Sequence, residues 1–526
     1  MSRQPNAVSV HLDGVIKRRG EATAYRFRGD AMTFDELGGL VRRAAGGLEA
    51  IGVGPGDRVG VMLRNRSEFF VISHAIWRLG AVLVPVNVLL SEFEVAHLIR
   101  DSGMRCLVAN GDLAALAAAA RGDTQEVTLV VAADAPGQTG DLTYEALLAR
   151  GADEFTARAP REDRLAVIAY TSGTTGVAKG AMLDDRHLHE WMLNVADHLG
   201  LTEKDNFLQV FPVHSVAPGI IGGWLTASLG SECVILERFD VPEIARVIEA
   251  HRVACFAMVP TMVLDILRHE FDTPPDFSSV RYIQVGGAAV PDRIRTELER
   301  RWGIPTIKSY GSTECNYVSL DHVGVTPKEG ASGQVLPHLE VTIRDTAGNV
   351  LPPGQVGEIC VGPKAGATRP FRPILGYWNA PEKTAEALAG GVFHTGDIGY
   401  VDADGFLFCV DRLKDMLIRG GNNVYPAELE AALHADPRVE DAYVVGVAHP
   451  RLGEVPKAYI VISPDAPGCS PDELIATANT RLARYKRIDK AEFIDAADLP
   501  RNAMNKVLKR ELAKRANADR TEAVSI

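Results

Sequence analysis

A ten-residue stretch, Thr-Ser-Gly-Thr-Thr-Gly-Val-Ala-Lys-Gly at positions 171–180, combines the residue types that bind phosphate. It follows an apolar run, 165–170, that we expect to be a buried strand. Glycines let successive backbone N–H groups converge on phosphate oxygens, while hydroxyls and an ammonium add further donors. The residues expected to contact the phosphates are Thr171, Ser172, Gly173, Thr174, Thr175, Gly176 and Lys179.

The spacing within this loop differs from that of a Walker A loop, in which a lysine directly follows a glycine and precedes Ser or Thr. Here two residues separate Lys179 from Gly176, and Gly180 follows the lysine. A P-loop NTPase is therefore disfavoured. Taken alone, the loop leaves open a flexible surface segment rich in glycine and threonine.

Four later motifs, in order, resemble those of the adenylate-forming superfamily of acyl-CoA synthetases, adenylation domains and firefly luciferases, and the 171–180 loop resembles the signature of that superfamily. The motifs are Tyr-Gly-Ser-Thr-Glu at 310–314, Phe-His-Thr-Gly-Asp at 393–397, the segments 411–415 and 420–428, and the segment 499–508. The resemblance spans nearly the whole chain.

The resemblance implies a role for each motif. Tyr310 would stack on adenine, Thr313 would contact the α-phosphate region, and Glu314 would hold Mg²⁺ through a hard carboxylate oxygen. Asp397 would accept hydrogen bonds from the ribose hydroxyls, and Arg412 would contact the ribose or a phosphate. Further nucleotide contacts are expected from Gly287, Ala288 and Gly311.

The C-terminal motifs imply a moving domain. Lys414 would be the pivot of the hinge, Gly420 and Gly421 would face the CoA, and Lys506 would be the catalytic lysine. Many relatives have glycine before that lysine, where this chain has Asn505, a residue type that tolerates left-handed backbone.

The acyl pocket is expected to be apolar. Its lining residues would be Val216, Gly219, Val259, Gly286 and Cys315. These small or apolar groups suit a fatty, alicyclic or aromatic acid. His214 would lie between this pocket and the thiol channel in a gating role, with simple core packing as the alternative.

Three positions depart from the pattern of the family. Ala178 stands where proline is usual, His394 where many relatives have arginine, and the aromatic motif around 211–214 is shortened. The histidine at 394 should leave the expected role of Asp397 unchanged.

The implied activity is an ATP-dependent acid–CoA ligase that forms acyl-AMP and pyrophosphate and then acyl-CoA and AMP. Its catalytic residues would be Lys506, Thr174, Glu314 and His214. Its cofactors would be ATP, Mg²⁺ and CoA. Alternatives are transfer to the phosphopantetheine of a carrier protein or to another nucleophile, luciferase-like oxidation, and a non-catalytic nucleotide-binding regulator. Amino-acid adenylation is disfavoured because His-Ser-Val-Ala at 214–217 offers no carboxylate for an α-ammonium.

The composition agrees with a globular enzyme. The 526 residues carry a net charge of −12, which argues against nucleic acid as a partner. Seven cysteines without a CxxC pair suggest neither a disulfide framework nor a zinc site, and fit the cytoplasm. We expect no targeting segment and no transmembrane segment, and a homodimer is left open.

The elements that would position these residues follow an α/β pattern. Apolar runs at 59–63 and 81–86 flank an amphipathic helix at 67–79, as in a parallel βαβ unit. Further strands are expected at 207–211, 233–236 and 254–259, with Asp240 and Glu243 spaced like a capping box. Short apolar runs at 340–409 indicate small β structure, and a helix beginning at Pro426 opens an α+β region.

We therefore predict an α/β fold in which a large N-terminal domain of doubly wound layers carries a β-rich subdomain and precedes a small mobile α+β domain. The expected boundaries are 1–411 for the ATP- and acyl-binding domain and 412–526 for the mobile cap, with the hinge at 411–415.

Overall fold

The computed structural model divides the chain into two compact units. The larger comprises Met1–Val341, Val361–His394 and Asp404–Leu407, and the smaller comprises Thr342–Cys360, Thr395–Ala403 and Phe408–Ile526. The structure describes residues 6–122, 124, 126–132, 140–159, 164–171, 178–216, 222–286, 292–369, 371–412, 415–419, 422–463, 468–501 and 507–523. A single boundary between 411 and 412 stays a prediction.

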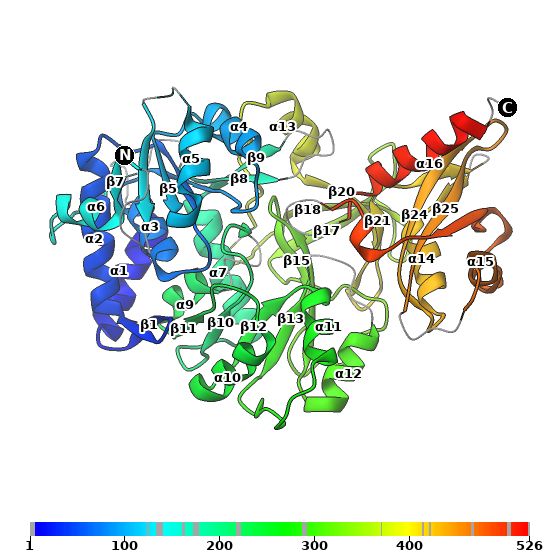
Figure 1. Cartoon of the computed structure of the whole chain (residues 1–526), viewed down its shortest axis with the longest axis horizontal. Helices are drawn as coiled ribbons and strands as arrows, with labels where there is room; N and C mark the ends of the chain where they lie inside the picture. Colours follow the sequence, from blue (N-terminus) through cyan, green and yellow to red (C-terminus); the bar gives the residue numbers. More distant parts are fainter. Residues whose placement is uncertain are drawn as a thin grey trace. The chain divides into compact units, whose positions relative to one another are not determined.

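An eight-stranded sheet forms one layer of the larger unit (Figure 1). In spatial order its strands are β19 (Gly376–Tyr377), β9 (Lys179–Asp184), β8 (Leu165–Thr171), β4 (Val82–Pro85), β3 (Arg58–Met62), β5 (Cys106–Asn110), β6 (Thr128–Ala132) and β7 (Leu142–Thr143). The expected βαβ unit is confirmed, because β3 and β4 are parallel and α3 (Ser67–Arg78) connects them.

In the part of the chain that the structure describes, five α-helices accompany the strands of this layer. They are α2 (Phe34–Ala50), α3, α4 (Glu92–Ser102), α5 (Ala114–Arg121) and α6 (Tyr144–Arg150). Both α2 and α4 begin with a complete capping box, at Thr33 and Ser91. The apolar faces of α4 and α5 pack with β3 to β6 in one core that includes Val84, Leu107 and Leu129.

A nine-stranded sheet forms the second layer. Its strands are β16 (Gln334–Val335), β15 (Asn316–Leu320), β14 (Thr306–Ser312), β13 (Tyr282–Val285), β12 (Cys255–Met258), β10 (Phe207–Gln209), β11 (Cys233–Ile235), β1 (Thr23–Phe27) and β2 (Asp30–Thr33). The strands β11, β10, β12, β13 and β14 are parallel, as the apolar runs predict.

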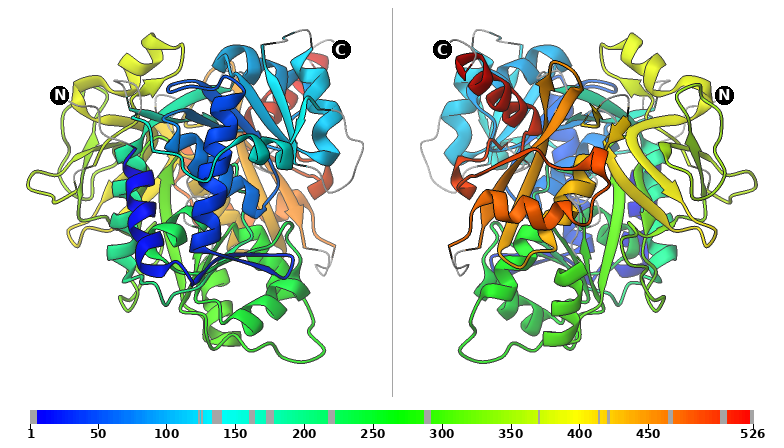
Figure 2. Two further views of the ribbon diagram at one scale, coloured as in Figure 1. Left: turned by 90° about the vertical axis from the view of Figure 1, so that its left-hand side faces the viewer. Right: turned by 90° about the vertical axis from the view of Figure 1, so that its right-hand side faces the viewer.

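The remaining helices of the larger unit are α1 (Ala7–Arg19), α7 (Asp185–Leu199), α9 (Gly223–Leu229), α10 (Val241–His251), α11 (Pro260–Arg268), α12 (Asp292–Trp302) and α13 (Pro381–Ala387). The left view of Figure 2 shows α1 and α2 in dark blue. Asp240 caps α10 as expected by accepting the Glu243 N–H. The Glu243 carboxylate pairs with Arg246, so the expected capping box forms only in its Asp240 half.

Aromatic side chains join the two layers in the interior of the larger unit. Trp77 and Phe70 of α3 pack edge-on against Trp224 of α9, and Phe70 stacks on Tyr25 of β1. All four side chains are almost fully buried. Because α3 is buried from Phe69 to Arg78 and packs on β3 and β4 of the first sheet and on β1 of the second, it joins the two layers.

The smaller unit is built on a five-stranded sheet. Its strands are β23 (Asn422–Val424), β22 (Leu417–Arg419), β25 (Gly453–Ile462), β24 (Val439–His449) and β26 (Lys490–Phe493). Its helices are α14 (Pro426–His434), α15 (Pro471–Asn479) and α16 (Lys509–Ala523). The helix expected at Pro426 is thus confirmed.

Alternation along β24 and β25 separates two cores in this unit. Val444 and Ile460 pack with α14 and α15, whereas Val445 and Tyr459 pack with α16, because successive side chains of a strand point to opposite faces. The right view of Figure 2 shows α16 in dark red beside the orange strands.

The expected small β structure forms a separate four-stranded sheet. It is ordered β17 (Leu339–Arg344), β18 (Gly357–Pro363), β20 (Phe393–Val401) and β21 (Leu407–Arg412). Its two middle strands, β18 and β20, each carry residues of both compact units.

All seven cysteines are free thiols. Five are buried and two, Cys409 and Cys469, are half-buried. Burial raises the pKa of Cys106, Cys233 and Cys255 to about 12 each. Within the described ranges, no helix is both long enough and apolar enough to cross a membrane.

Candidate active site

The phosphate loop is carried by the hairpin of β8 and β9. Thr171 at the end of β8 pairs in antiparallel register with Lys179 at the start of β9, so the two strands hold the loop at both ends. Gly180 allows this close packing, since a Cβ there would lie 2.5 Å from Ile168 Cγ2. Ser172, Gly173, Thr174, Thr175 and Gly176 lie outside the described residues, and their contacts stay predictions.

Glu314 lies beside the end of this hairpin. The Thr171 hydroxyl is 3.5 Å from Glu314 Oε1, and the Tyr377 hydroxyl donates to the same oxygen at 3.1 Å. Lys179 Nζ lies 5.7 Å from the centre of the Tyr377 ring. Three predicted residues from two separate motifs, Thr171, Lys179 and Glu314, therefore meet at one place.

The sequence did not predict Tyr377. It lies on β19, which pairs with β9 in antiparallel register with Tyr377 opposite Ala181. Burial and then the charge of Glu314 raise the pKa of this phenol far above its ordinary value, so the hydroxyl keeps its proton and donates it. No motif marked this position, because only the pairing of β19 with β9 places it there.

The turn that carries Glu314 is tightly packed. A Cβ on Gly311 would lie 1.7 Å from the carbonyl oxygen of Asn316, so only glycine fits. Asn316 has a positive φ of 56°, and the Glu314 N–H donates to the Ser312 hydroxyl at 3.2 Å. Tyr310, Thr313 and Glu314 are half-buried, which leaves part of each side chain accessible to a ligand.

A hydrogen bond between the side chains of His187 and Asn316 supports this turn. The side-chain amide of Asn316 hydrogen-bonds to Nε2 of His187 in the first turn of α7. Both side chains are buried, and burial lowers the pKa of His187, which favours the neutral ring. Neither residue carries a sequence signal, because a histidine on an amphipathic helix and an asparagine in a strand are common.

The expected acyl-pocket residues all belong to the larger unit. Val216 and Cys315 are buried, and Val259 and Gly286 are half-buried. The Gly286 N–H donates to the carbonyl of Met258, which brings Gly286 close to Val259. A Cβ on Gly286 would lie 2.4 Å from the Ser309 hydroxyl, so Ser309 is a neighbour that the sequence did not predict.

Gly219, Gly287 and Ala288 lie outside the described residues. His214 is half-buried, and the loss of hydration lowers its pKa to about 4. The lowered pKa favours the neutral ring at physiological pH.

The expected ribose-binding aspartate belongs to the smaller unit. Arg412 Nε lies 3.4 Å from Asp397 Oδ1, and the Asp397 N–H donates to the Thr395 hydroxyl at 3.0 Å. Gly396 between them has a positive φ of 70°. The structure thus brings Asp397 and Arg412 together. Lys414, Gly420, Gly421 and Lys506 lie outside the described residues.

Two family models match the chain. The model of AMP-binding enzymes matches residues 12–369, and the model of the AMP-binding enzyme C-terminal domain matches residues 428–506. The second match falls within the smaller unit and includes Lys506.

Curated and solved relatives agree with these matches. A feruloyl-CoA synthase of Amycolatopsis is 37% identical over 94% of this chain and 96% of its own length. A long-chain-fatty-acid–CoA ligase of Mycobacterium tuberculosis is 32% identical over 98% of both. The o-succinylbenzoate CoA synthetase of Bacillus subtilis, solved with its acyl-adenylate intermediate, is 30% identical with a TM-score of 0.82 over 97% of this chain and 98% of that one. The chain belongs to the family of AMP-binding enzymes, the adenylate-forming superfamily.

Proposed function

We propose that the chain is an AMP-forming acid–CoA ligase that acts on a hydrophobic carboxylic acid, with ATP and CoA as co-substrates and Mg²⁺ as cofactor. The observation that carries the proposal is the convergence of Thr171, Lys179 and Glu314, which supplies hydroxyl, ammonium and carboxylate groups at the end of one hairpin. Relatives that act on aromatic and fatty acids support it.

The residues present fit a magnesium site. Mg²⁺ is usually bound through one or two carboxylates together with substrate phosphates and water. Glu314 offers such a carboxylate, and Thr171 offers a hydroxyl next to it. Bound there, the ion would neutralise charge that develops on the phosphates.

In the first step the substrate carboxylate attacks the α-phosphate of ATP, and pyrophosphate leaves. Lys179 and the hydroxyls of the 171–180 loop would hold the β- and γ-phosphates, and Lys506 would stabilise the charge near the attacked phosphate. Asp397 would orient the ribose by accepting its hydroxyl protons, and Arg412, which lies beside that carboxylate, would hold it in place.

In the second step the thiol of CoA attacks the carbonyl of the acyl adenylate, and AMP leaves. The smaller unit would turn about Lys414, withdraw Lys506 and present Gly420 and Gly421. His214, neutral at physiological pH, would line the route of the thiol.

The decisive experiment measures pyrophosphate release across a panel of aliphatic, alicyclic and aromatic acids, with and without CoA. Wild type should release pyrophosphate with at least one acid and form a thioester when CoA is present. Lys506→Ala should lose adenylation, whereas Lys490→Ala, an exposed lysine of the same unit, should match wild type. No release with any acid, or a Lys506→Ala variant equal to wild type, would overturn the proposal.

The acceptor and the hinge can be tested separately. Thioester formation on a carrier protein but not on CoA would favour the carrier-protein alternative. Lys414→Pro should spare adenylation and depress thioester formation, because only the second step requires rotation. Equal losses in both steps would contradict domain alternation.

Location and assembly follow as further proposals. The seven free cysteines support a reducing compartment, and we assign the enzyme to the cytoplasm. A homodimer is left open.

A further inference from the structure

Asp101, in the last turn of α4, accepts hydrogen bonds from two parts of the eight-stranded sheet. Its carboxylate oxygen Oδ2 accepts the hydroxyl of Tyr170 on β8 at 2.6 Å. Its backbone carbonyl accepts the indole N–H of Trp378 at 2.9 Å and the side-chain amide of Asn379 at 3.0 Å, both just after β19. Figure 1 shows α4 beside β8 and β9. One residue therefore connects α4 with β8 and with the end of β19.

The charge of Asp101 opposes the helix that carries it. A carboxylate in the last turn of a helix is repelled by the negative end of the helix dipole. Arg58 offsets part of this cost, because its guanidinium donates to the carbonyls of Ser102 and Gly103 at 2.6 Å each. The same guanidinium lies 5.6 Å from the centre of the Trp378 ring. The favourable contribution of the acid thus comes from its contacts outside α4.

Tyr170, Gly180 and Trp378 form a row across the sheet beneath Asp101. Tyr170 pairs with Gly180 in the antiparallel register of β8 and β9, and the Trp378 N–H donates to the Gly180 carbonyl at 2.7 Å. A Cβ on Gly180 would lie 3.2 Å from the Trp378 Cβ and 3.4 Å from Tyr170 Cζ. The two aromatic side chains therefore enclose this glycine, and both donate to Asp101.

The opposite face of the same segments carries the candidate site. Successive side chains of a strand point to opposite faces, so Thr171 and Tyr377, which are next to Tyr170 and Trp378, point away from α4. Thr171 and Tyr377 both contact Oε1 of Glu314, at 3.5 and 3.1 Å. The Glu314 carboxylate is thus held by two residues, each of which is anchored through its neighbour to the end of α4. All of these residues belong to the larger unit.

We propose that Asp101 is a positioning residue for the magnesium site. Its hydrogen bonds fix β8 and the segment after β19 at the spacing in which Thr171 and Tyr377 both reach Glu314. The inference rests on the proposed function, in which the Glu314 carboxylate holds Mg²⁺. Because Asp101 acts through other residues, its loss should weaken magnesium-dependent ATP binding without abolishing it.

The test measures ATP binding to the full-length chain by calorimetry at a series of Mg²⁺ concentrations, with no acid present and hence no turnover. Asp101→Ala and Trp378→Phe each remove one anchor. Each should raise the Mg²⁺ concentration for half-maximal ATP binding by about threefold to tenfold, as for a lost hydrogen bond that acts through a neighbour. Asp101→Asn keeps an acceptor for Tyr170 and should recover most of the affinity. Glu92→Ala, which removes an exposed carboxylate in the first turn of α4, should match wild type.

Two comparisons separate positioning from a general loss of structure. ATP binding in excess EDTA should be the same in Asp101→Ala, Trp378→Phe and wild type, because only the magnesium-dependent part passes through Glu314. In a Tyr377→Phe background, Trp378→Phe should add little, since the route from Trp378 to Glu314 is already interrupted. A residue with a merely structural role would lower ATP affinity equally with and without magnesium.

If Asp101→Ala is insoluble, Tyr170→Phe, which removes the same hydrogen bond, takes its place. The positioning role would be overturned by an unchanged magnesium requirement, by equal losses with and without magnesium, or by additive effects of Trp378→Phe and Tyr377→Phe. Each of these results would leave the ligase proposal intact. A wild-type chain that binds no ATP at any magnesium concentration would instead overturn the ligase proposal, and the positioning role with it.

Discussion

The hydroxyl of Tyr377 donates a hydrogen bond to Glu314, Oη to Oε1 at 3.1 Å, although Tyr377 lies on β19 of the eight-stranded sheet and Glu314 in the turn between β14 and β15 of the nine-stranded sheet. The contact orients the carboxylate that the ligase proposal assigns to Mg²⁺. Removing a group that orients a metal ligand commonly lowers metal affinity by about tenfold to a hundredfold.

Tyr377→Phe should therefore raise the Mg²⁺ concentration needed for half-maximal pyrophosphate release by about tenfold, since the carboxylate loses its donor. Magnesium titrations of the wild type and the variant measure the shift. Tyr485→Phe, an exposed tyrosine of the smaller unit, serves as the control. An unchanged magnesium requirement would show that Tyr377 does not orient the ligand.

Gly311→Ala should destabilise the larger unit by about 1–3 kcal/mol, because the new Cβ would overlap the Asn316 carbonyl. Urea unfolding measures the change, and pyrophosphate release should fall with it. Gly39→Ala gives a matched control of opposite sign. Gly39 lies inside α2 with open space around it, so alanine should add about 0.5–1 kcal/mol of stability. Similar effects at both positions would contradict the packing of the turn.

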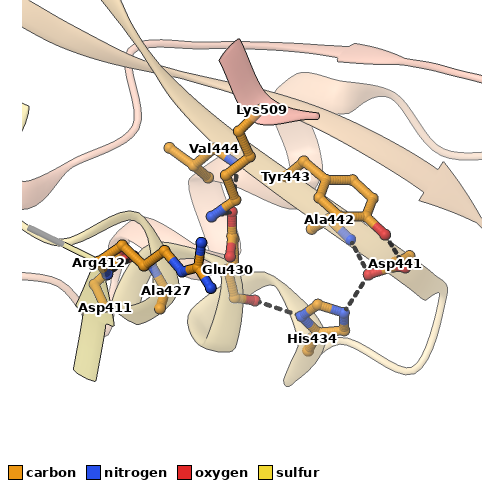
Figure 3. A network of polar contacts seen from close by, with 10 residues as sticks. All are labelled: Asp411, Arg412, Ala427, Glu430, His434, Asp441, Ala442, Tyr443, Val444 and Lys509. Atoms are coloured by element: carbon orange, nitrogen blue, oxygen red, sulfur yellow. Dashed lines mark hydrogen bonds and ion pairs between the residues drawn. The ribbon is translucent and has the colours of Figure 1, made fainter. Parts of the chain in front are cut away.

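The pair of His434 and Asp441 predicts a pH dependence in the smaller unit. Nε2 of His434 lies 3.2 Å from Asp441 Oδ1 (Figure 3). Burial opposes the charged ring, but Asp441 and the Glu430 carbonyl raise the pKa of His434 above 6.5, while the pKa of Asp441 is lowered below 3.8. The His434 contribution is complete below its unfolded pKa and is lost as the pH rises through the higher folded value.

His434→Gln should thus cost more stability near pH 5.5 than near pH 8.5, by about 1 kcal/mol. Hydrogen exchange of peptides that cover α14 and β24 in the full-length chain measures the difference. Asp441→Asn should be non-additive with it at the lower pH. Additive effects, or an equal cost at both pH values, would show that the ion pair does not contribute.

His214 should not titrate in the physiological range, because burial lowers its pKa to about 4. The ratio of thioester-forming rates of wild type and His214→Gln should therefore stay constant between about pH 6 and 8. A pH–rate profile of both proteins measures this ratio. An inflection near the ordinary histidine pKa that disappears in the variant would contradict it.

Helices and strands in which apolar residues recur at a regular spacing could be predicted from the sequence, because that spacing shows which face of the element is buried. The strand, helix and strand at 58–85 and the helix at Pro426 appear as expected. It is harder to predict which of several nearby partners a charged side chain will bind. The spacing of Asp240 and Glu243 predicts a capping box. Arg246 lies one turn further along α10, and its guanidinium forms an ion pair with the Glu243 carboxylate.

The described part of the candidate site contains two kinds of residue: those that belong to a sequence motif, and those that hold the motif residues in place. Thr171, Lys179 and Glu314 could be found because their types and order match a family pattern. Tyr377, His187 and Asn316 could not, because each acts through a contact that only strand pairing and helix packing create. A sequence without aligned relatives carries no trace of such contacts.

The buried thiols of this chain also determine how its chemistry can be followed. With pKa values raised to about 12, Cys106, Cys233, Cys255 and Cys360 present almost no thiolate at neutral pH, and their sulfur atoms, like that of Cys315, are buried away from reagents. In a continuous assay with a chromogenic disulfide, consumption of free CoA should therefore be read against a background from Cys409 and Cys469 alone. The native enzyme can be assayed without replacing any cysteine.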